Sequence, residues 1–368
     1  YNLTTNRMDE FLSIFVPDLK LSPGTKLMGT YDGRMEEFSM LLTSKTIGYQ
    51  DFVFEQVDLS QYLTSNSIDA RYSLLRLDYG DSISIDNVLF TTSGEKNILE
   101  SELTWNPKQI NASDIKWQTI IVDNSQVNLL LEPSFFSLNK QRWDIEKASD
   151  MSVTSNDLHI SKLVLKRGRQ FISLDGCISR NDADKMNFRV HEVDLNELGT
   201  LVGSPIKMNG LLNGWGNISN PYTNLHYMGD ASIFGLFLND QEVGDIFVQS
   251  QWNKGSESIG MTGDLMYRGN QTFAFQGSYF TERKDENLEF DLLFDNTDIQ
   301  FTSAFLDPDI VNNIRGQLNG SLSVSGTPDF PKLDGRVKLN GGNAKIEILG
   351  VNFGFDGEVI ADEYGFYI

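Results

Sequence analysis

Apolar and polar residues alternate along most of this chain. In residues 288–294 Leu, Phe, Leu and Phe occupy every second position, and residues 186–190 and 273–275 repeat the pattern. A period of two gives each strand one apolar and one polar face. The same alternation occurs at 336–339, 345–348 and 353–355. The pattern therefore predicts a chain made mainly of β-strands, and most of the alternating runs are five to seven residues long.

Turn signals separate these runs at short intervals. Residues 180–184, 282–287 and 340–343 are rich in Asn, Gly or charged residues. Short strand-to-strand spacing predicts antiparallel pairing. Helical signals are few. Met8, Phe11, Leu12 and Phe15 predict two turns that end at Pro17, and residues 195–201 and 302–306 each predict one turn.

A long internal repeat is present in the second half of the chain. RGRQFISLDG at 167–176 aligns with RGNQTFAFQG at 268–277, and VDL at 193–195 aligns with TDI at 297–299. GLLNG at 210–214 then aligns with GQLNG at 316–320. The offset rises slowly from 101 to 106 residues, as loop insertions would cause, while the apolar positions stay in phase.

The repeat divides the chain into three predicted segments. Two β repeats cover 158–258 and 259–368, and an N-terminal β segment covers 1–157. The tripeptide VDL at 57–59 suggests that this first segment contains a divergent copy. Tandem units that bury a face against their neighbours form solenoid-like structures. We therefore expect an elongated, curved antiparallel sheet with a few short helices.

Composition and charge exclude several classes of protein. Hydrophobic residues make up 40% of the 368 residues and aromatic residues 11%, which argues against disorder. The net charge of −21 makes nucleic acid a poor partner, because phosphate binding needs clustered Lys and Arg. No run of 18 apolar residues predicts a membrane-spanning helix. Because the chain begins at Tyr1 without Met, we expect it to be a fragment.

No arrangement of residues typical of catalysis or metal binding stands out. The three histidines are far apart and lack a zinc-type spacing, so we interpret them as strand residues. They are His159, His191 and His226. Asp182 with Asp184, and Asp307 with Asp309, lack the further ligands of a calcium loop and favour solvated turns.

The remaining candidates for chemistry also favour structural roles. Gly341 and Gly342 have no following helix to form a phosphate loop and predict a hairpin turn. The single cysteine, Cys177, aligns with Ser278 of the next repeat, which favours a structural thiol. The sequence therefore predicts a protein that is not an enzyme and uses no cofactor or metal.

The order of these motifs resembles the TamB family of bacterial envelope proteins, within the wider AsmA-like group and especially its Bacteroidetes type. The resemblance runs from about residue 20 to the end and includes LLEPSFFSLNKQRWDI at 130–145 and LSVSGTPDFPKLDG at 322–335. No one of these motifs is diagnostic; their order and spacing together carry the resemblance.

The resemblance implies a fold and a function. TamB-like proteins form a half-pipe or taco-like β-groove with an apolar concave face. They are anchored in the inner membrane and cross the periplasm. They are not enzymes, and they work with an outer-membrane partner related to the BamA barrel family. They are implicated in moving phospholipid to the outer membrane and in assembling outer-membrane proteins. The resemblance thus predicts a periplasmic segment that contacts phospholipid acyl chains, with the BamA-related partner bound outside it. We take a monomer as the default oligomeric state.

The apolar stripe is the candidate site. By itself, alternation fits a filled sandwich core as well as an open groove, and the resemblance favours the groove. The predicted lining residues are Ile172, Leu174, Met186, Phe188, Val190, Phe273, Phe275, Leu288, Phe290, Leu292, Phe294, Leu318, Leu322, Val324, Val337, Leu339, Ile346, Ile348, Phe353 and Phe355.

Two other readings of the alternation remain open. A structural or adhesive β-sandwich array that binds glycan or protein would have the same repeats but a dry, filled core. An outer-membrane barrel would share the alternation and an aromatic end such as residues 364–368. However, barrel strands need about 9–11 residues of lipid face, which is longer than the runs seen here.

Overall fold

The computed structural model describes residues 1–5, 16–80, 83–107, 109, 111–138, 140–201, 206–307, 309–362 and 365–367. The fold is all-β and antiparallel, as the alternation predicts: 73% of the residues are in strands and 4% are helical. The helix predicted around Met8 and Phe15 lies outside the described residues.

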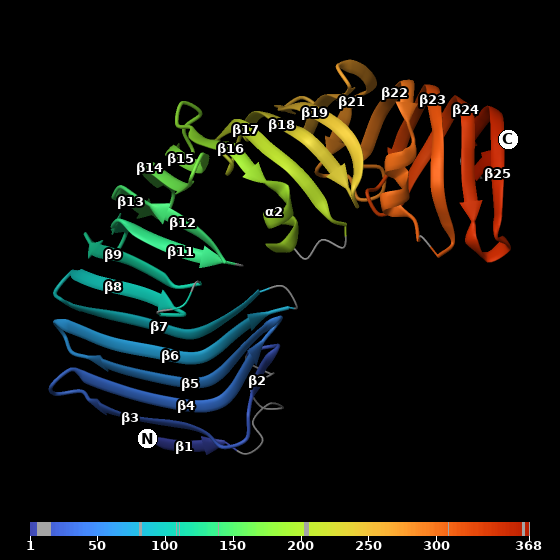
Figure 1. Ribbon diagram of the computed structural model, residues 1–368. Helices are drawn as coiled ribbons and strands as arrows, with labels where there is room; N and C mark the ends of the chain where they lie inside the picture. The colour runs from blue at the N-terminus through green and yellow to red at the C-terminus, as the bar shows by residue number, and fades with distance from the viewer. Residues whose placement is uncertain are drawn as a thin grey trace. The chain divides into compact units, whose positions relative to one another are not determined.

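The elements follow one another along the chain as shown in Figure 1. The strands are β1 (Asn2–Thr5), β2 (Leu19–Leu21), β3 (Thr25–Asp32), β4 (Glu37–Tyr49), β5 (Phe52–Leu63), β6 (Ser67–Tyr79), β7 (Ile83–Glu95), β8 (Ile98–Trp105), β9 (Ser113–Ile121), β10 (Gln126–Leu131), β11 (Ser134–Leu138), β12 (Gln141–Ile145), β13 (Ser149–Thr154), β14 (Leu158–Arg167), β15 (Gln170–Ile178), β16 (Met186–Asp194), β17 (Met208–Ser219), β18 (His226–Leu238), β19 (Gln241–Asn253), β20 (Ser258–Tyr267), β21 (Asn270–Phe280), β22 (Leu288–Asp298), β23 (Val311–Gly326), β24 (Pro331–Ile346), β25 (Val351–Asp362) and β26 (Gly365–Tyr367). The helical elements are α2 (Leu195–Leu201), η1 (Gln300–Phe305) and η2 (Glu347–Leu349).

The chain forms two compact units. The first comprises Tyr1–Cys177 with Thr200–Gly203, and the second comprises Ile178–Gly199 with Ser204–Ile368. The division falls near the end of β15 and coincides with neither predicted repeat boundary. The three predicted segments describe a periodicity in sequence, and their assignment as structural divisions stays a prediction.

The first unit contains a ladder of antiparallel neighbours. Strand β1 pairs with β3, and β3 to β10 then pair in sequence order before β10 pairs with β13 and β13 with β14. At two places in this ladder, two short strands pair with the same neighbouring strand. Strands β10 and β11 both pair with β9, and β12 and β13 both pair with β14. Pro133, which has no N–H for the ladder, lies at the first of these places.

The second unit is a simple meander. Each strand from β16 to β26 pairs antiparallel with the next one along the chain. Glycine and polar residues continue the strands beyond the apolar runs, so β23 and β24 each reach 16 residues. The strands are therefore longer than the alternating runs of five to seven residues in the sequence.

A recurring β-bulge explains the repeated sequence motifs. Glu192 and Asn296 have positive φ angles of 50° and 49°, and each is followed by an almost fully buried residue, Val193 at 1% and Thr297 at 2% exposure. Gln56 and Val57 repeat this arrangement in the first unit, with φ of 47° and 3% exposure. The motifs at 57–59, 193–195 and 297–299 thus begin with the residue that a bulge turns into the interior.

The repeated pentamers GLLNG at 210–214 and GQLNG at 316–320 supply the hydrogen-bond acceptor for this bulge. The Asn213 side-chain oxygen accepts a hydrogen bond from the Glu192 N–H at 3.0 Å, and Asn319 does the same for Asn296 at 2.9 Å. The leading glycine of each pentamer, Gly210 or Gly316, has a φ of 144° or 135° at a register shift. Such φ values favour glycine. The Gly of the motif therefore allows the backbone conformation, and the Asn accepts the hydrogen bond from the bulge.

Both copies then form a short helical element. Asp194 and Asp298 accept hydrogen bonds from the backbone N–H groups of Asn196 and Gln300, each at 2.9 Å, and α2 and η1 begin beside them. Leu195 of α2 and Phe301 of η1 pack in one cluster with Leu236, Val243 and Leu265 of the sheet. The predicted turn at 195–201 is confirmed, and the turn predicted at 302–306 is a 3₁₀ helix that begins two residues earlier.

Two local predictions at the end of the chain were wrong. Residues 340–343 lie inside β24 and form a bulge opposite β25 rather than a hairpin turn. The Gly341 N–H donates to Asp356 across that bulge, so the glycines bend a strand instead of ending it. The strand predicted at 345–348 ends at Ile346, because η2 begins at Glu347. The predicted turns at 180–184 and 282–287 do separate strands.

Candidate functional site

In the second unit, one register row crosses ten strands without a polar side chain. Directly opposite residues on antiparallel strands point to the same face. The row consists of Val190, Gly214, Ala231, Val248, Gly263, Phe275, Leu292, Leu322, Gly335 and Ala361. We call the row, together with the neighbouring residues on the same side of the sheet, the apolar face.

Phenylalanine rings pack together over the adjacent rows of this face. The centroids of Phe273 and Phe294 are 5.2 Å apart, and those of Phe275 and Phe290 are 6.2 Å apart. Leu322, Val337 and Ala361 form a buried cluster against which Leu292, Phe294, Leu318, Leu333 and Val359 pack. Side chains from successive strands thus form one continuous apolar surface.

Most of the predicted lining residues lie on this apolar face. By register it includes Met186, Phe188, Val190, Phe273, Phe275, Leu288, Phe290, Leu292, Phe294, Leu318, Leu322, Val324, Val337, Leu339, Ile346, Phe353 and Phe355. Ile348 lies in η2, outside the strands, and is 77% exposed. Ile172 and Leu174 share one face of β15 in the first unit.

The exposure of the predicted lining residues distinguishes an open face from a filled core. Of the twenty, Met186, Leu322 and Val337 are buried, fifteen are partly exposed, and Phe353 and Ile348 are exposed. Side chains between two packed sheets would be buried almost completely. Within the described part of the second unit, the sheet pairs as one meander, and no facing sheet covers these side chains.

Sequence reasoning missed the apolar residues of β17 to β20. Leu212, Ile233, Ile246 and Leu265 form a row on the same face, yet none was predicted to line it. Bulges after Asn209, Ile233 and Leu265 shift the phase of the alternation, and glycines interrupt it. Reading each glycine as a place-holder for an apolar position would have revealed the row.

The first unit contains a separate apolar row that was also missed. It consists of Leu27, Leu42, Leu59, Tyr72, Phe90, Leu103 and Ile115, one residue from each strand from β3 to β9. All seven side chains are partly exposed. The Phe90 ring lies 5.7 Å from Tyr72 and 5.8 Å from Trp117 between ring centroids. The row is visible only once the strands are aligned, because no single strand is strongly apolar.

The residues considered for catalysis or metal binding have structural partners. Asp182 accepts hydrogen bonds from Asn220 at 2.6 Å and Asn224 at 2.8 Å, and His226 Nε2 lies 3.7 Å from it. These bonds, from Asn220 most strongly, lower the pKa of Asp182. Asp184 accepts a hydrogen bond from Ser179 at 2.7 Å. The cluster therefore ties two turns together.

The other candidates for chemistry are dispersed. Asp307 accepts a hydrogen bond from the Asp309 N–H at 2.9 Å within a turn, and Cys177 is partly buried. His159 and His191 lie on β14 and β16, and neither joins a metal-binding group. Among the described residues, no group of three or more His, Cys, Asp or Glu side chains is placed to hold a metal ion. No helix in the described ranges is long and apolar enough to cross a membrane.

Comparison with known proteins gives no match. No family model matches the sequence, and neither a curated protein nor a solved structure matches the chain. The family assignment therefore stays a prediction from the sequence motifs, and the functional argument depends on the geometry of the apolar faces.

Proposed function

We propose that this chain is a periplasmic segment of a TamB-like envelope protein whose apolar β-sheet faces bind phospholipid acyl chains. In this role it carries phospholipid between the inner and outer membranes, aids outer-membrane protein assembly, or does both. The supporting observation is the apolar face of the second unit, where ten strands align an uninterrupted apolar row and most of the surrounding side chains stay partly exposed.

Acyl chains suit such a surface physically. Contiguous exposed apolar surface is uncommon on soluble proteins unless a ligand or partner covers it. Each methylene group that leaves water contributes about 0.8 kcal/mol, so ten methylenes contribute about 8 kcal/mol before the cost of association. The side chains of the apolar row have no hydrogen-bonding groups. Such a surface suits ligands that differ in headgroup but share hydrocarbon tails.

The geometry counts against the sandwich alternative. A sandwich needs two sheets that face each other about 10 Å apart with a shared dry core. In the described residues of the second unit, strands β16 to β26 pair only with their neighbours in sequence. Helices α2 and η1 pack on one part of the apolar face, and no second sheet covers the partly exposed rings of Phe275 and Phe290 in the described residues.

Native mass spectrometry of the purified chain, with lipid extraction from the same sample, tests the proposal. We expect phospholipid to copurify with the wild-type chain and to be lost from Phe275→Glu, which places a charge in the apolar row. Gln276→Glu is the matched control, because it adds the same charge to the opposite face of the same strand. A folded, lipid-free wild-type chain would contradict the proposal.

A further inference from the structure

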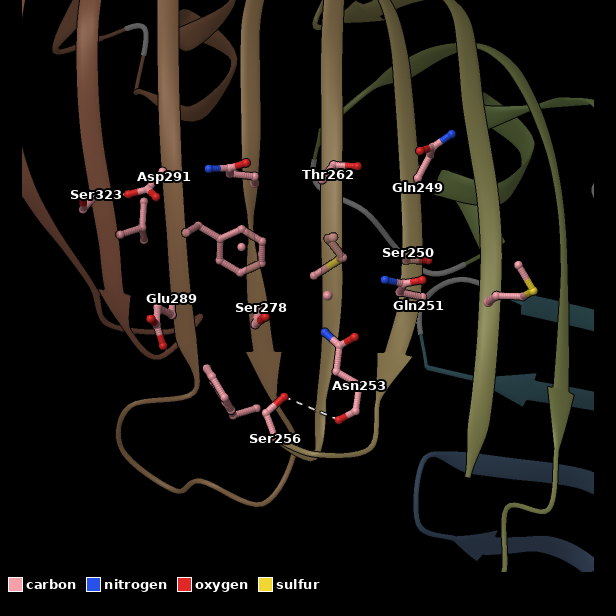
Figure 2. A pocket seen from close by; sticks show the side chains of 18 of the residues that line it. Gln249, Ser250, Gln251, Asn253, Ser256, Thr262, Ser278, Glu289, Asp291 and Ser323 are labelled. Carbon is pink, nitrogen blue, oxygen red and sulfur yellow. Dashed lines mark hydrogen bonds between the residues drawn. The ribbon is translucent and has the colours of Figure 1, made fainter. Parts of the chain in front are cut away.

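The polar face of the second unit contains a broad hollow of about 1130 Å³ (Figure 2). One register row across its floor consists of Trp215, Asp230, Gln249, Thr262, Gln276 and Asp291. Each of these residues is adjacent in sequence to a member of the apolar row, so its side chain points to the opposite face. The floor of the hollow therefore lies on the face opposite the apolar row, and Phe290 and Val324 of the apolar face also contribute to its lining.

An exposed aromatic side chain lies at one end of the hollow. Trp215 on β17 is 42% exposed, and its diagonal neighbour Met228 on β18 is 43% exposed. The exposed indole presents a large apolar ring to water, as do Phe247 and Leu293 on the same face, and it offers a ligand a flat ring surface. The flat face of an indole packs well against the C–H groups on one side of a pyranose ring, whose hydroxyl groups stay at the edge.

Amide and hydroxyl groups continue from Trp215 across the hollow. Figure 2 shows Gln249, Thr262 and Ser278 on three neighbouring strands, β19 to β21. Within the described part of the chain, the side chains of these residues and of Gln251 and Gln276 form no hydrogen bond with the protein. Amides offer both donors and acceptors, which match the paired donor and acceptor character of sugar hydroxyls.

The charge of the lining disfavours anionic ligands. The residues that line the hollow include no Lys, Arg or His, but they include the carboxylates Asp230, Glu289 and Asp291. Phosphate, sulfate and uronate groups need cationic partners or converging N–H donors. The Ser323 hydroxyl donates to Asp291 at 3.0 Å, so this carboxylate is oriented within the protein and can accept further hydroxyl donors. No metal-binding group occurs among the described residues to reverse the charge.

We propose that this hollow binds an uncharged oligosaccharide, with one sugar ring stacked on Trp215 and the following rings laid across β18 to β22. Neighbouring strands are about 4.8 Å apart, and an extended chain of 1,4-linked pyranose rings advances by a similar length per ring. The row from Gln249 to Asp291 thus presents polar groups at intervals that successive rings can use. This binding is independent of the proposed lipid function, because it uses the other face of the sheet.

Isothermal titration calorimetry of the whole chain with a panel of neutral hexasaccharides tests the proposal. The panel consists of 1,4-linked glucose, mannose and N-acetylglucosamine hexamers, and hexagalacturonate serves as the acidic counterpart. We expect at least one neutral hexamer to bind and hexagalacturonate not to bind. Trp215→Ala should weaken binding at least about tenfold, and Gln276→Ala should weaken it less.

Trp252→Ala is the matched control, because Trp252 is next to Gln251 on β19 and points to the apolar face. It should leave saccharide binding unchanged. Trp215→Phe keeps an aromatic face and should bind with intermediate affinity, so it tests the stacking even where the alanine variant folds poorly. Equal binding by Trp215→Ala, tighter binding of hexagalacturonate, or no neutral hexamer bound more tightly than about 1 mM would overturn the proposal. Lipid capture by Trp215→Ala should equal that of the wild type, which separates this test from that of the lipid function.

Discussion

The side-chain oxygen of Asn213 on β17 accepts a hydrogen bond from the backbone N–H of Glu192 on β16, with 3.0 Å between the two atoms. Asn319 and Asn296 repeat this pair in the next copy. Asp175 and Asp245 accept equivalent bonds from Lys162 and Gly235, which also have positive φ angles. A bulge whose N–H is satisfied by an Asn or Asp of the next strand is thus a repeated device of this fold.

Removing this acceptor should destabilise the second unit. Asn319→Ala leaves the Asn296 N–H to water, and we expect the free energy of unfolding to fall by about 0.5–1.5 kcal/mol. Asn319→Asp keeps an acceptor, as Asp175 and Asp245 do elsewhere, and should stay near the wild type. Equilibrium urea unfolding of the three chains measures the difference, and equal losses in both variants would contradict this role of Asn319.

The Phe275 ring lies over Gly263, its direct partner on β20, so closely that a methyl group on Gly263 would collide with the ring. We expect Gly263→Ala to cost about 1–3 kcal/mol through overpacking. Combining it with Phe275→Leu should cost less than the sum of the two single changes. Gly255→Ala is the control, since nothing lies within 4 Å of its added methyl group. Strict additivity in urea unfolding would show that the ring and the glycine do not interact.

The Asp182 cluster predicts a pH dependence. Hydrogen bonds from Asn220 and Asn224 lower the pKa of Asp182 in the folded chain. A lowered pKa stabilises the fold above the ordinary carboxyl pKa, and this contribution disappears as the pH falls through the lowered value. Wild type should therefore be more stable than Asp182→Asn at about pH 7, and the gap should narrow towards about pH 3. A gap that stays constant across urea titrations at these pH values would contradict the assignment.

The first unit should capture lipid on its own apolar row. Phe90→Glu places a charge between Tyr72 and Trp117, so we expect fewer phospholipid molecules per chain in native mass spectra. Thr91→Glu, on the opposite face of β7, should keep the wild-type number. Equal lipid loss in both variants would show that charge, rather than its position on the apolar row, reduces binding.

The sequence contains enough information for the fold class and much of the apolar face. Alternation is local, so it identifies strands such as β21 and β22 and the face of Phe273, Phe290 and Leu292 directly. The repeat motifs were visible as well, but their structural role was not. The bulge and the Asn that accepts a hydrogen bond from its N–H lie on different strands.

The features that sequence reasoning missed depend on the register in which neighbouring strands pair. The apolar row of the first unit and the polar hollow each combine single residues from many strands, and no one strand carries the pattern. Gly341 and Gly342 were misassigned for a related reason, since a glycine pair favours a turn locally and only the pairing with β25 shows a bulge.

The central claim is that acyl chains contact the apolar face, and photo-crosslinking on β22 tests it most directly. A benzophenone amino acid replaces either Phe290, on the apolar face, or Leu293, which is 57% exposed on the opposite face. Each chain is irradiated with vesicles of phosphatidylethanolamine and phosphatidylglycerol, and crosslinked lipid is measured by mass spectrometry. The account predicts several-fold more lipid adduct at position 290, although position 293 is more exposed. Equal yields, or a higher yield at position 293, would contradict it.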